Sequence, residues 1–120
     1  MLVRRLKSHS SETGTVYQYY FVGKRPALPD EAYSPATEFV FDVSFGGNPT
    51  FAISVFLPTH AVELWQRKHG RELVDTEQYA AAKMRLFRGF DEIENMRENG
   101  RRLLIAGEDL DELLDLLGVD

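Results

Sequence analysis

Histidines and carboxylates at helical spacing are the first residues to consider for chemistry. His60 and Glu63 lie three positions apart in a segment of helical periodicity, close enough to share a metal ion. A third ligand at a matching spacing is missing, and no His-Glu-x-x-His motif occurs. The pattern therefore favours exposed side chains at the ends of a helix, with no metal site and no cofactor.

Three acids in a second helical segment, Asp91, Glu92 and Glu94, form another possible catalytic or metal cluster. Asp91 and Glu92 are about 100° apart on a helical wheel. Both stand three or four positions from Arg88, a spacing typical of ion pairs on one helix. We interpret the acids as a solvated charged face.

The second helical segment has an apolar stripe that runs from Tyr79 to Ile93, and two basic side chains lie on or near this stripe. Arg97 falls in line with Tyr79, and Lys83 is about 40° away on the wheel. Long basic side chains often lay their stems on apolar surface and send the charge to water. The alternative is a pocket between helix and sheet in which Arg97 and Lys83 bind an anion, with Trp65 or Tyr79 as a wall.

Basic residues near the N-terminus suggest a different partner. Residues 1–25 contain five basic residues and one acid, whereas residues 103–120 contain six acids and no base. Tyrosines 17, 19 and 20 precede Lys24 and Arg25, and Arg4, Arg5, Arg101 and Arg102 are candidates to join them in space. Such a surface can stack bases and neutralise phosphates. The tyrosines also suit a buried strand, and opposite charges at the two ends of the chain can meet on folding.

The elements that must position these residues are organised around a predicted hairpin, residues 39–57. Phe39, Phe41, Val43 and Phe45 alternate with other residues, and the same alternation resumes after Gly46-Gly47-Asn48-Pro49-Thr50 with Phe51, Ile53, Val55 and Leu57. Pairing Phe45 with Phe51, and so on to Phe39 with Leu57, places all eight on one face. The other face receives Phe56 among smaller or polar residues, which predicts that something covers its end.

The remaining elements follow from periodicity and from breaking residues. The sequence predicts a strand at 15–23, a proline-rich loop at 24–35, and a helix at 60–69 with Thr59 as N-cap and Gly70 as its stop. A long helix is expected at 75–99, with Asp75 and Gln78 at capping-box spacing, then a strand at 101–106 and a helix at 108–117. The first thirteen residues carry no clear signal. The prediction is a single α+β domain, 1–120, with a small antiparallel sheet covered on one face by two or three helices in the order β-β-β-α-α-β-α.

Composition narrows the classes of function. The chain has 120 residues, a net charge of −5 and no cysteine, which excludes disulfides and thiolate chemistry. No apolar run approaches the roughly 20 residues of a membrane helix, and the N-terminus lacks the apolar core of a secretion signal, so a cytoplasmic protein without a membrane partner is expected. The acidic balance makes nucleic acid a less favoured partner.

No motif assigns a reaction, and the outline resembles many small bacterial domains without transferring a function. Apolar surface on the long helix, the last helix and Phe56 exceeds what one small sheet is expected to cover. The leading hypothesis is a non-enzymatic interaction or regulatory module that acts as a homodimer. An anionic-ligand domain or minor enzyme at Trp65, Tyr79, Lys83 and Arg97 is the alternative, and nucleic-acid binding through Arg4, Arg5, Lys24 and Arg25 is the third.

Overall fold

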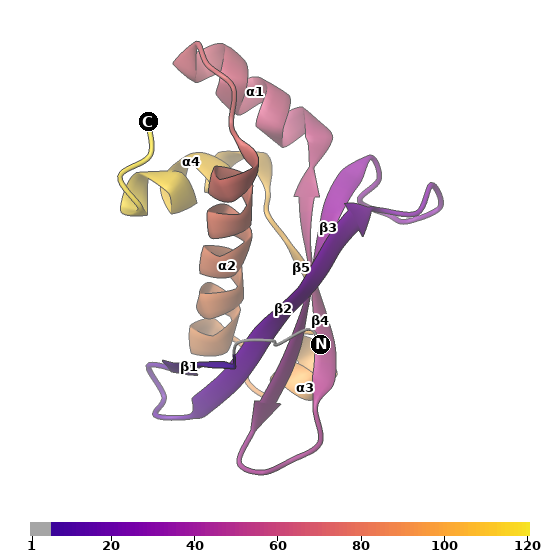
Figure 1. The fold of residues 1–120 in the computed structure, drawn as a ribbon, viewed down its shortest axis with the longest axis vertical. Helices are drawn as coiled ribbons and strands as arrows, with labels where there is room; N and C mark the ends of the chain where they lie inside the picture. The colour runs from indigo at the N-terminus through magenta and orange to yellow at the C-terminus, as the bar shows by residue number, and fades with distance from the viewer. Residues whose placement is uncertain (1–5) are drawn as a thin grey trace, which may run out of the picture.

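The computed structural model describes residues 6–120 as a five-stranded sheet with helices packed on it (Figure 1). The elements in chain order are β1 (Lys7–Ser10), β2 (Val16–Pro26), β3 (Ala36–Phe45), β4 (Phe51–Pro58), α1 (Thr59–His69), α2 (Asp75–Glu92), α3 (Met96–Asn99), β5 (Arg102–Leu104) and α4 (Gly107–Leu116).

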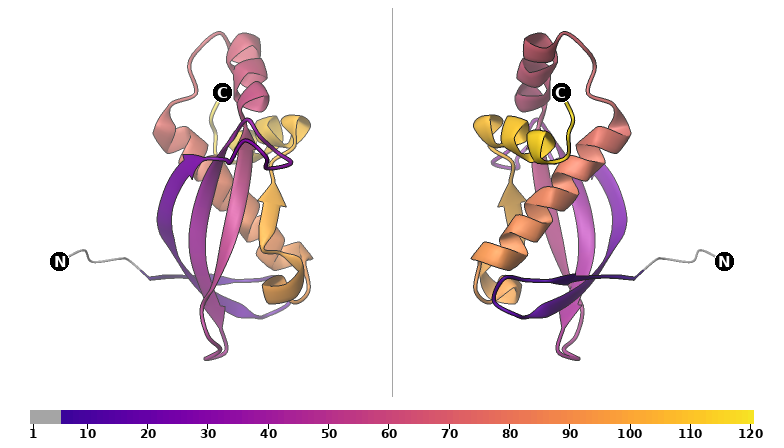
Figure 2. Two further views of the ribbon diagram at one scale, coloured as in Figure 1. Left: turned by 90° about the vertical axis from the view of Figure 1, so that its right-hand side faces the viewer. Right: turned by 90° about the vertical axis from the view of Figure 1, so that its left-hand side faces the viewer.

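The sheet has the strand order β1-β2-β3-β4-β5 and is antiparallel except for β5, which pairs parallel to β4. Helices α2 and α4 lie on one side of the sheet, and α1 continues from the end of β4 (Figures 1 and 2). This confirms the predicted α+β class and its approximate order. Strand β1 is an addition, because its polar sequence, Lys7-Ser8-His9-Ser10, carries no alternating apolar signal.

The register of the β3–β4 hairpin differs from the expected one by two residues. Phe51 pairs with Val43, Ile53 with Phe41, and Val55 with Phe39. Gly46 and Gly47 form a tight turn with positive φ angles of 58° and 74°. Pro49 has no amide to donate, so pairing resumes only at Phe51, while Phe45 pairs with Tyr17 of β2. A shift of two keeps every side chain on its expected face, and the predicted apolar face is therefore intact.

A β-bulge in β2 reverses the direction of the side chains that follow it. Phe21 pairs with Phe41, but the next pair joins Gly23 to Val40, which leaves Val22 as an extra residue. Beyond the bulge, Arg25 pairs with Glu38 on the side away from the helices. Lys24 instead reaches Asp75 at the start of α2, with 3.4 Å between Nζ and Oδ1. Without the bulge, Arg25 would share the face of Tyr17 and Phe21.

The core lies between the hairpin face, α2 and α4. Phe39, Phe41, Ile53 and Val55 are fully buried, as are Ala82 and Leu86 of α2 and Leu110 and Leu114 of α4. None of the helices in residues 6–120 has the length and apolar character needed to span a bilayer.

Helix boundaries depart from the predicted ones at three points. Thr59 is the first residue of α1 and not its N-cap, although Gly70 ends the helix with a φ of 67° as expected. Val74 precedes α2 and donates its amide to Glu77 at 3.1 Å, in place of the expected pairing of Asp75 with Gln78. Helix α2 ends at Glu92, because Ile93 is extended and Asn95 has a φ of 55°, so Arg97 belongs to the separate α3.

Two glycines make room for one buried methionine near this break. A Cβ atom on Gly89 would lie 3.1 Å from Met96 Cε, and one on Gly100 would lie 2.3 Å from Met96 Sδ. Met96 is itself fully buried. Close packing at Gly89 thus involves Met96 together with Leu103 of β5.

The Met96 site gives a stability prediction. Gly100→Ala should lower the free energy of unfolding by about 1–3 kcal/mol, because the added methyl group overpacks a buried side chain that must then move. Urea denaturation measures this change. The matched control, Gly107→Ala, adds the same methyl group at the start of α4, where nothing lies within 4 Å, and should be neutral or slightly stabilising. Adding Met96→Ala to Gly100→Ala should cost less than the two single changes together; strict additivity would contradict this packing.

Candidate functional site: the open face of the sheet

The side of the sheet away from the helices is mixed in chemistry, and we call it the open face (Figure 2, left). Its side chains come from alternate positions of four strands: Gln18, Tyr20, Gly23 and Arg25 of β2; Glu38, Val40, Asp42 and Ser44 of β3; Ala52, Ser54 and Phe56 of β4; and Arg102 and Leu104 of β5. Both signs of charge and several hydroxyl groups are thus brought together from segments far apart in the sequence.

Glu38 is the buried charge of this face, with only 8% of its surface exposed. Arg25 donates to it twice, from Nε to Oε1 at 3.0 Å and from Nη2 to Oε2 at 3.3 Å. The hydroxyl of Ser54 donates to Oε2 at 2.6 Å. A buried carboxylate is costly unless its oxygens are satisfied, and here three donors from two neighbouring strands satisfy them. The hydrogen bond from Arg25 is the main reason that the pKa of Glu38 is lowered; burial opposes this shift and Ser54 adds to it.

A small apolar cluster lies next to Glu38. Phe56 is 1% exposed and contacts Tyr33 of the 27–35 loop, with 5.2 Å between the ring centroids. Ala27, Ala36 and Leu104 complete the cluster. The guanidinium of Arg102 lies 5.1 Å from the Phe56 ring centroid and pairs with Glu31 of the same loop. The loop thus covers the end of the face at Phe56, as the sequence predicts, and an ion pair ties it to β5.

Tyr20 and Asp42 form a second polar pair on the open face. The Tyr20 hydroxyl donates to Asp42 Oδ2 at 2.7 Å across the β2–β3 pairing. The charged and hydroxyl groups in the middle of the face are therefore held by one another. A surface of this kind presents fixed donors and acceptors, which suits recognition of a complementary surface.

The four residues expected to form an anion pocket are distributed along the molecule. Trp65 is buried in α1, where it stacks on His69 and contacts the guanidinium of Arg71. Arg97 is in α3, at the opposite end of the molecule (Figure 1), where it bonds the Pro49 carbonyl and lies 4.6 Å from the Phe51 ring centroid.

Tyr79 and Lys83, one turn apart on α2, pack against different rings of β2. Tyr79 contacts Phe21 at 4.8 Å between ring centroids. The Lys83 Nζ atom lies 5.9 Å from the Tyr19 ring centroid. Burial, and then the nearby Lys7, hold the pKa of Lys83 below its ordinary value. In both Lys83 and Arg97 the cation thus lies near an aromatic ring, as expected when the stems of basic side chains rest on apolar surface.

Of the residues expected to bind nucleic acid, Arg4 and Arg5 lie outside the described residues. Lys24 is paired with Asp75, and Arg25 with Glu38. The bulge directs these neighbouring cations to opposite faces of the sheet, so they do not form one basic stripe.

A histidine–aspartate pair unites residues that sequence reasoning kept apart. His9 Nε2 lies 3.3 Å from Asp91 Oδ1, and the His9 ring stacks on Phe87 at 4.3 Å. Asp91 also accepts the Glu12 amide, whereas Arg88 pairs with Glu112 of α4, so the expected ion pair of Asp91 with Arg88 is wrong. No local spacing signals a contact across 82 positions.

The described residues around His9 do not supply a free nucleophile or a set of metal ligands. The nearby hydroxyl of Ser11 bonds Thr13 and the Thr15 amide within its own turn. Within residues 6–120, no group of three or more His, Asp or Glu side chains is arranged to hold a metal ion. We assign the pair to anchoring the β1–β2 hairpin on α2.

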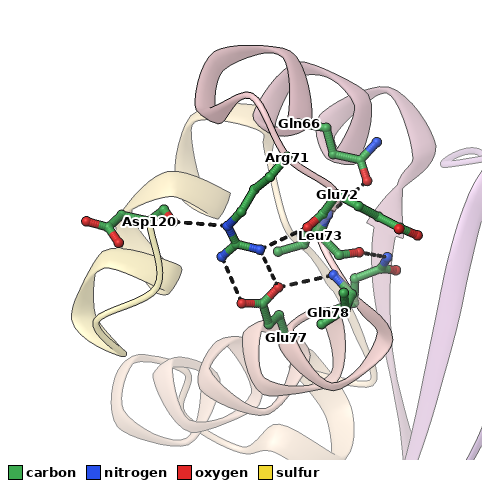
Figure 3. Close-up of polar contacts among 8 residues, drawn as sticks. Gln66, Arg71, Glu72, Leu73, Glu77, Gln78 and Asp120 are labelled. Carbon is green, nitrogen blue, oxygen red and sulfur yellow. Dashed lines mark hydrogen bonds and ion pairs between the residues drawn. The ribbon is translucent and has the colours of Figure 1, made fainter.

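Arg71 links three segments at the other end of the molecule (Figure 3). It donates to both oxygens of Glu77 at 2.9 Å, to the Glu72 carbonyl at 2.9 Å and to the Asp120 carbonyl at 3.1 Å. The same guanidinium lies 4.8 Å from the Trp65 ring centroid. These contacts join α1, the start of α2 and Asp120. We therefore assign a structural role to the polar groups that surround Arg71.

Comparison with known proteins gives no independent assignment. No protein-family model matches the chain, and no curated protein or solved structure matches it significantly. The function proposed below therefore depends on the geometry of the open face.

The Glu38 network predicts a particular loss of stability in acid. Because its pKa is lower in the folded than in the unfolded chain, its stabilisation is present above the unfolded-state pKa and is lost as pH falls through the folded one. Glu38→Gln should destabilise the protein at neutral pH by about 1–3 kcal/mol, and the difference from wild type should shrink in acid. Urea titrations at a series of pH values measure both effects. Glu63→Gln, an exposed change on α1, is the control; equal pH profiles for wild type and Glu38→Gln would contradict the role of the network.

Proposed function

We propose that this chain is a non-catalytic interaction module that forms a homodimer through the open face of its sheet. The observation that carries the proposal is the contrast between the two faces. One face is packed against α2 and α4, and the other presents a mixture of charged, hydroxyl and apolar side chains. An antiparallel sheet can face water on one side, but here a buried glutamate and two arginines are fixed on that side.

The helical side offers less surface for a partner than its sequence suggests. Every residue of α2 from Glu77 to Asp91 is buried or half-buried. The leucines of α4 at positions 110, 113 and 114 are buried within the same chain. The excess apolar surface that motivates a helix-mediated dimer is thus largely used inside one copy, which favours the sheet face as the interface.

The residue types on the open face suit association. Arg and Tyr are enriched in protein interfaces, and Arg25, Arg102 and Tyr33 are all held by neighbours on or beside this face. Carboxylates at Glu31, Glu38 and Asp42 stand among them. A face with both signs of charge can complement itself across a two-fold axis, where each residue pair is formed twice. The same mixture gives no excess of positive charge for a polyanion.

Self-association should be visible in sedimentation velocity at micromolar concentrations, with wild type sedimenting as a dimer. Ala52→Arg places a long charged side chain at an exposed position of the open face, opposite Asp42, so the fold should be retained. The dimer should be weakened by at least about tenfold in Kd. Added salt should also weaken it, because exposed ion pairs are screened.

The matched control introduces the same residue on the helical side. Leu64 of α1 is 53% exposed, and Leu64→Arg should leave the dimer unchanged. A wild-type protein that remains a monomer, or a dimer lost with Leu64→Arg and kept with Ala52→Arg, would refute the open face as the interface. A melting curve for each variant shows whether the monomer is still folded.

A further inference from the structure

A cavity of about 380 Å³ lies where the β1–β2 hairpin meets the C-terminal end of α2 (Figure 1). Its volume is within the range of small-molecule sites. The hairpin contributes two threonines and Tyr17 to the lining, and the end of α2 contributes Phe90, Ile93 and three acids. Tyr17 and Phe90 belong to the core between sheet and helices, so the cavity is on the side of the sheet opposite the open face.

Tyr17 supplies this cavity with a hydroxyl group that the fold itself does not use. The side chain is only 5% exposed, it stacks on Phe90 with 4.2 Å between ring centroids, and it lines the cavity. The hydroxyl has no hydrogen-bond partner within residues 6–120. It is also not sealed off, because Trp65 Nε1 is the one enclosed side-chain polar atom without a partner in that range. The Tyr17 hydroxyl therefore opens into the cavity, where a ligand can satisfy it.

Three carboxylates stand around the cavity, and none of the described residues that line it is basic. Asp91 Oδ1 accepts from His9 and from the Glu12 amide, but Asp91 Oδ2 has no hydrogen bond within residues 6–120. The side chains of Glu92 and Glu94 form no hydrogen bond or ion pair in the described part of the chain. The cavity thus offers several negatively charged acceptors that have no partner of their own.

The position of these acids at the end of a helix adds to the attraction for a cation. Carbonyl groups at the C-terminal end of a helix carry partial negative charge, so a cation is stabilising there and an acid is not. Helix α1 follows this rule with three bases in its last turn, whereas α2 has none. The arginines earlier in α2 are bonded elsewhere, Arg85 to the Leu104 carbonyl and Arg88 to Glu112. A bound cation would supply the charge that the helix lacks.

The lining favours an organic cation over a metal ion. Within residues 6–120, no three His, Asp or Glu side chains converge as metal ligands. The rings of Tyr17 and Phe90 and the side chain of Ile93 give the cavity an apolar part that suits a methylene chain. An aliphatic diamine combines both properties, because its ammonium groups can reach separate carboxylates while its chain lies on the apolar part.

We propose that this cavity binds a small aliphatic diamine, with one ammonium group between Asp91 and the Tyr17 hydroxyl and the other at Glu94. The ammonium group donates to the carboxylate and to the phenol oxygen, so the unpartnered hydroxyl gains a hydrogen bond on binding. The site is separate from the proposed dimer interface, because the two lie on opposite sides of the sheet. Binding therefore requires no second copy.

The test is an amide NMR titration of the isotope-labelled full chain with putrescine, the linear four-carbon diamine. Saturable shifts should appear at Thr13, Thr15 and Glu94, with a Kd of about 1 mM or lower. Two further ligands are controls: the corresponding diol has the same chain without charge, and Mg²⁺ has the same charge without a chain. Each should bind at least about tenfold more weakly than the diamine. Equal binding of Mg²⁺ would show a general attraction of cations to acids and would overturn the site.

Two variants separate the hydroxyl from the charge. Tyr17→Phe should weaken diamine binding by at least about threefold, yet leave the ligand-free melting temperature unchanged or raised, because the fold makes no hydrogen bond to that hydroxyl. Glu94→Gln removes one exposed charge and should weaken binding to a similar extent. The matched controls lie outside the cavity: Tyr79→Phe removes a hydroxyl and Glu63→Gln an exposed charge, and both should leave the affinity unchanged.

Each result supports or overturns the diamine site. Saturable shifts around the cavity that both cavity variants reduce, and neither control variant reduces, support it. Titration without saturation, or affinity that Tyr17→Phe and Glu94→Gln leave unchanged, overturns it. A Tyr17→Phe protein that is less stable without ligand also overturns it, because the hydroxyl would then be bonded within the fold. None of these measurements depends on dimerisation, so a failure here leaves the proposed function as it stands.

Discussion

The apolar face of the β3–β4 hairpin is the constraint on which the rest of the structure depends. Phe39, Phe41, Ile53 and Val55 all point to one side, and a single chain of 120 residues has to cover them. Helix α2 crosses this face and α4 packs beside it (Figure 2, right). Because burial of apolar area is the main stabilising term, the helical segments are committed to this side. The opposite face must be stabilised by what the strands and one loop provide.

The charged groups at the centre of that opposite face are stable because they are satisfied locally. Glu38 is buried, yet Arg25 and Ser54 reach its oxygens from the adjacent strands. The bulge at Val22 makes this possible, since it turns Arg25 toward Glu38 and away from the core. The 27–35 loop then covers Phe56 beside the network, with Arg102 and Glu31 as its fastening. A local irregularity in one strand thus determines which cation faces the buried carboxylate.

The sequence patterns predicted which face of the sheet a side chain lies on better than they predicted which residue it contacts. The period-two alternation identified which side of β3 and β4 is buried, because side-chain direction is a local property, and the glycine at position 70 ended α1 as expected. The hairpin register depended on where Pro49 allows pairing to resume, and the end of α2 on packing of Met96 against Gly89 and Gly100. The helical wheel placed Arg97 in line with Tyr79 because it assumed one continuous helix, whereas α2 ends at Glu92 and Arg97 belongs to α3. Contacts such as His9 with Asp91 arise from the fold alone, and no spacing encodes them.

Folding and the proposed association are separable in this architecture. Leucines 110, 113 and 114 of α4 are buried within the same chain, as are Leu86 and Phe90 of α2, so the core is formed inside one copy. Apart from the buried Glu38, the side chains assigned to association are exposed or half-buried, and they lie on the opposite side of the sheet, where the ion pairs that stabilise the face are closed within one copy. The proposed interface would therefore be added to a domain whose core is already formed. Substitutions on the open face should then change the affinity of the proposed dimer while the unfolding equilibrium of one copy stays nearly constant, a separation that an obligate dimer sharing one core does not allow.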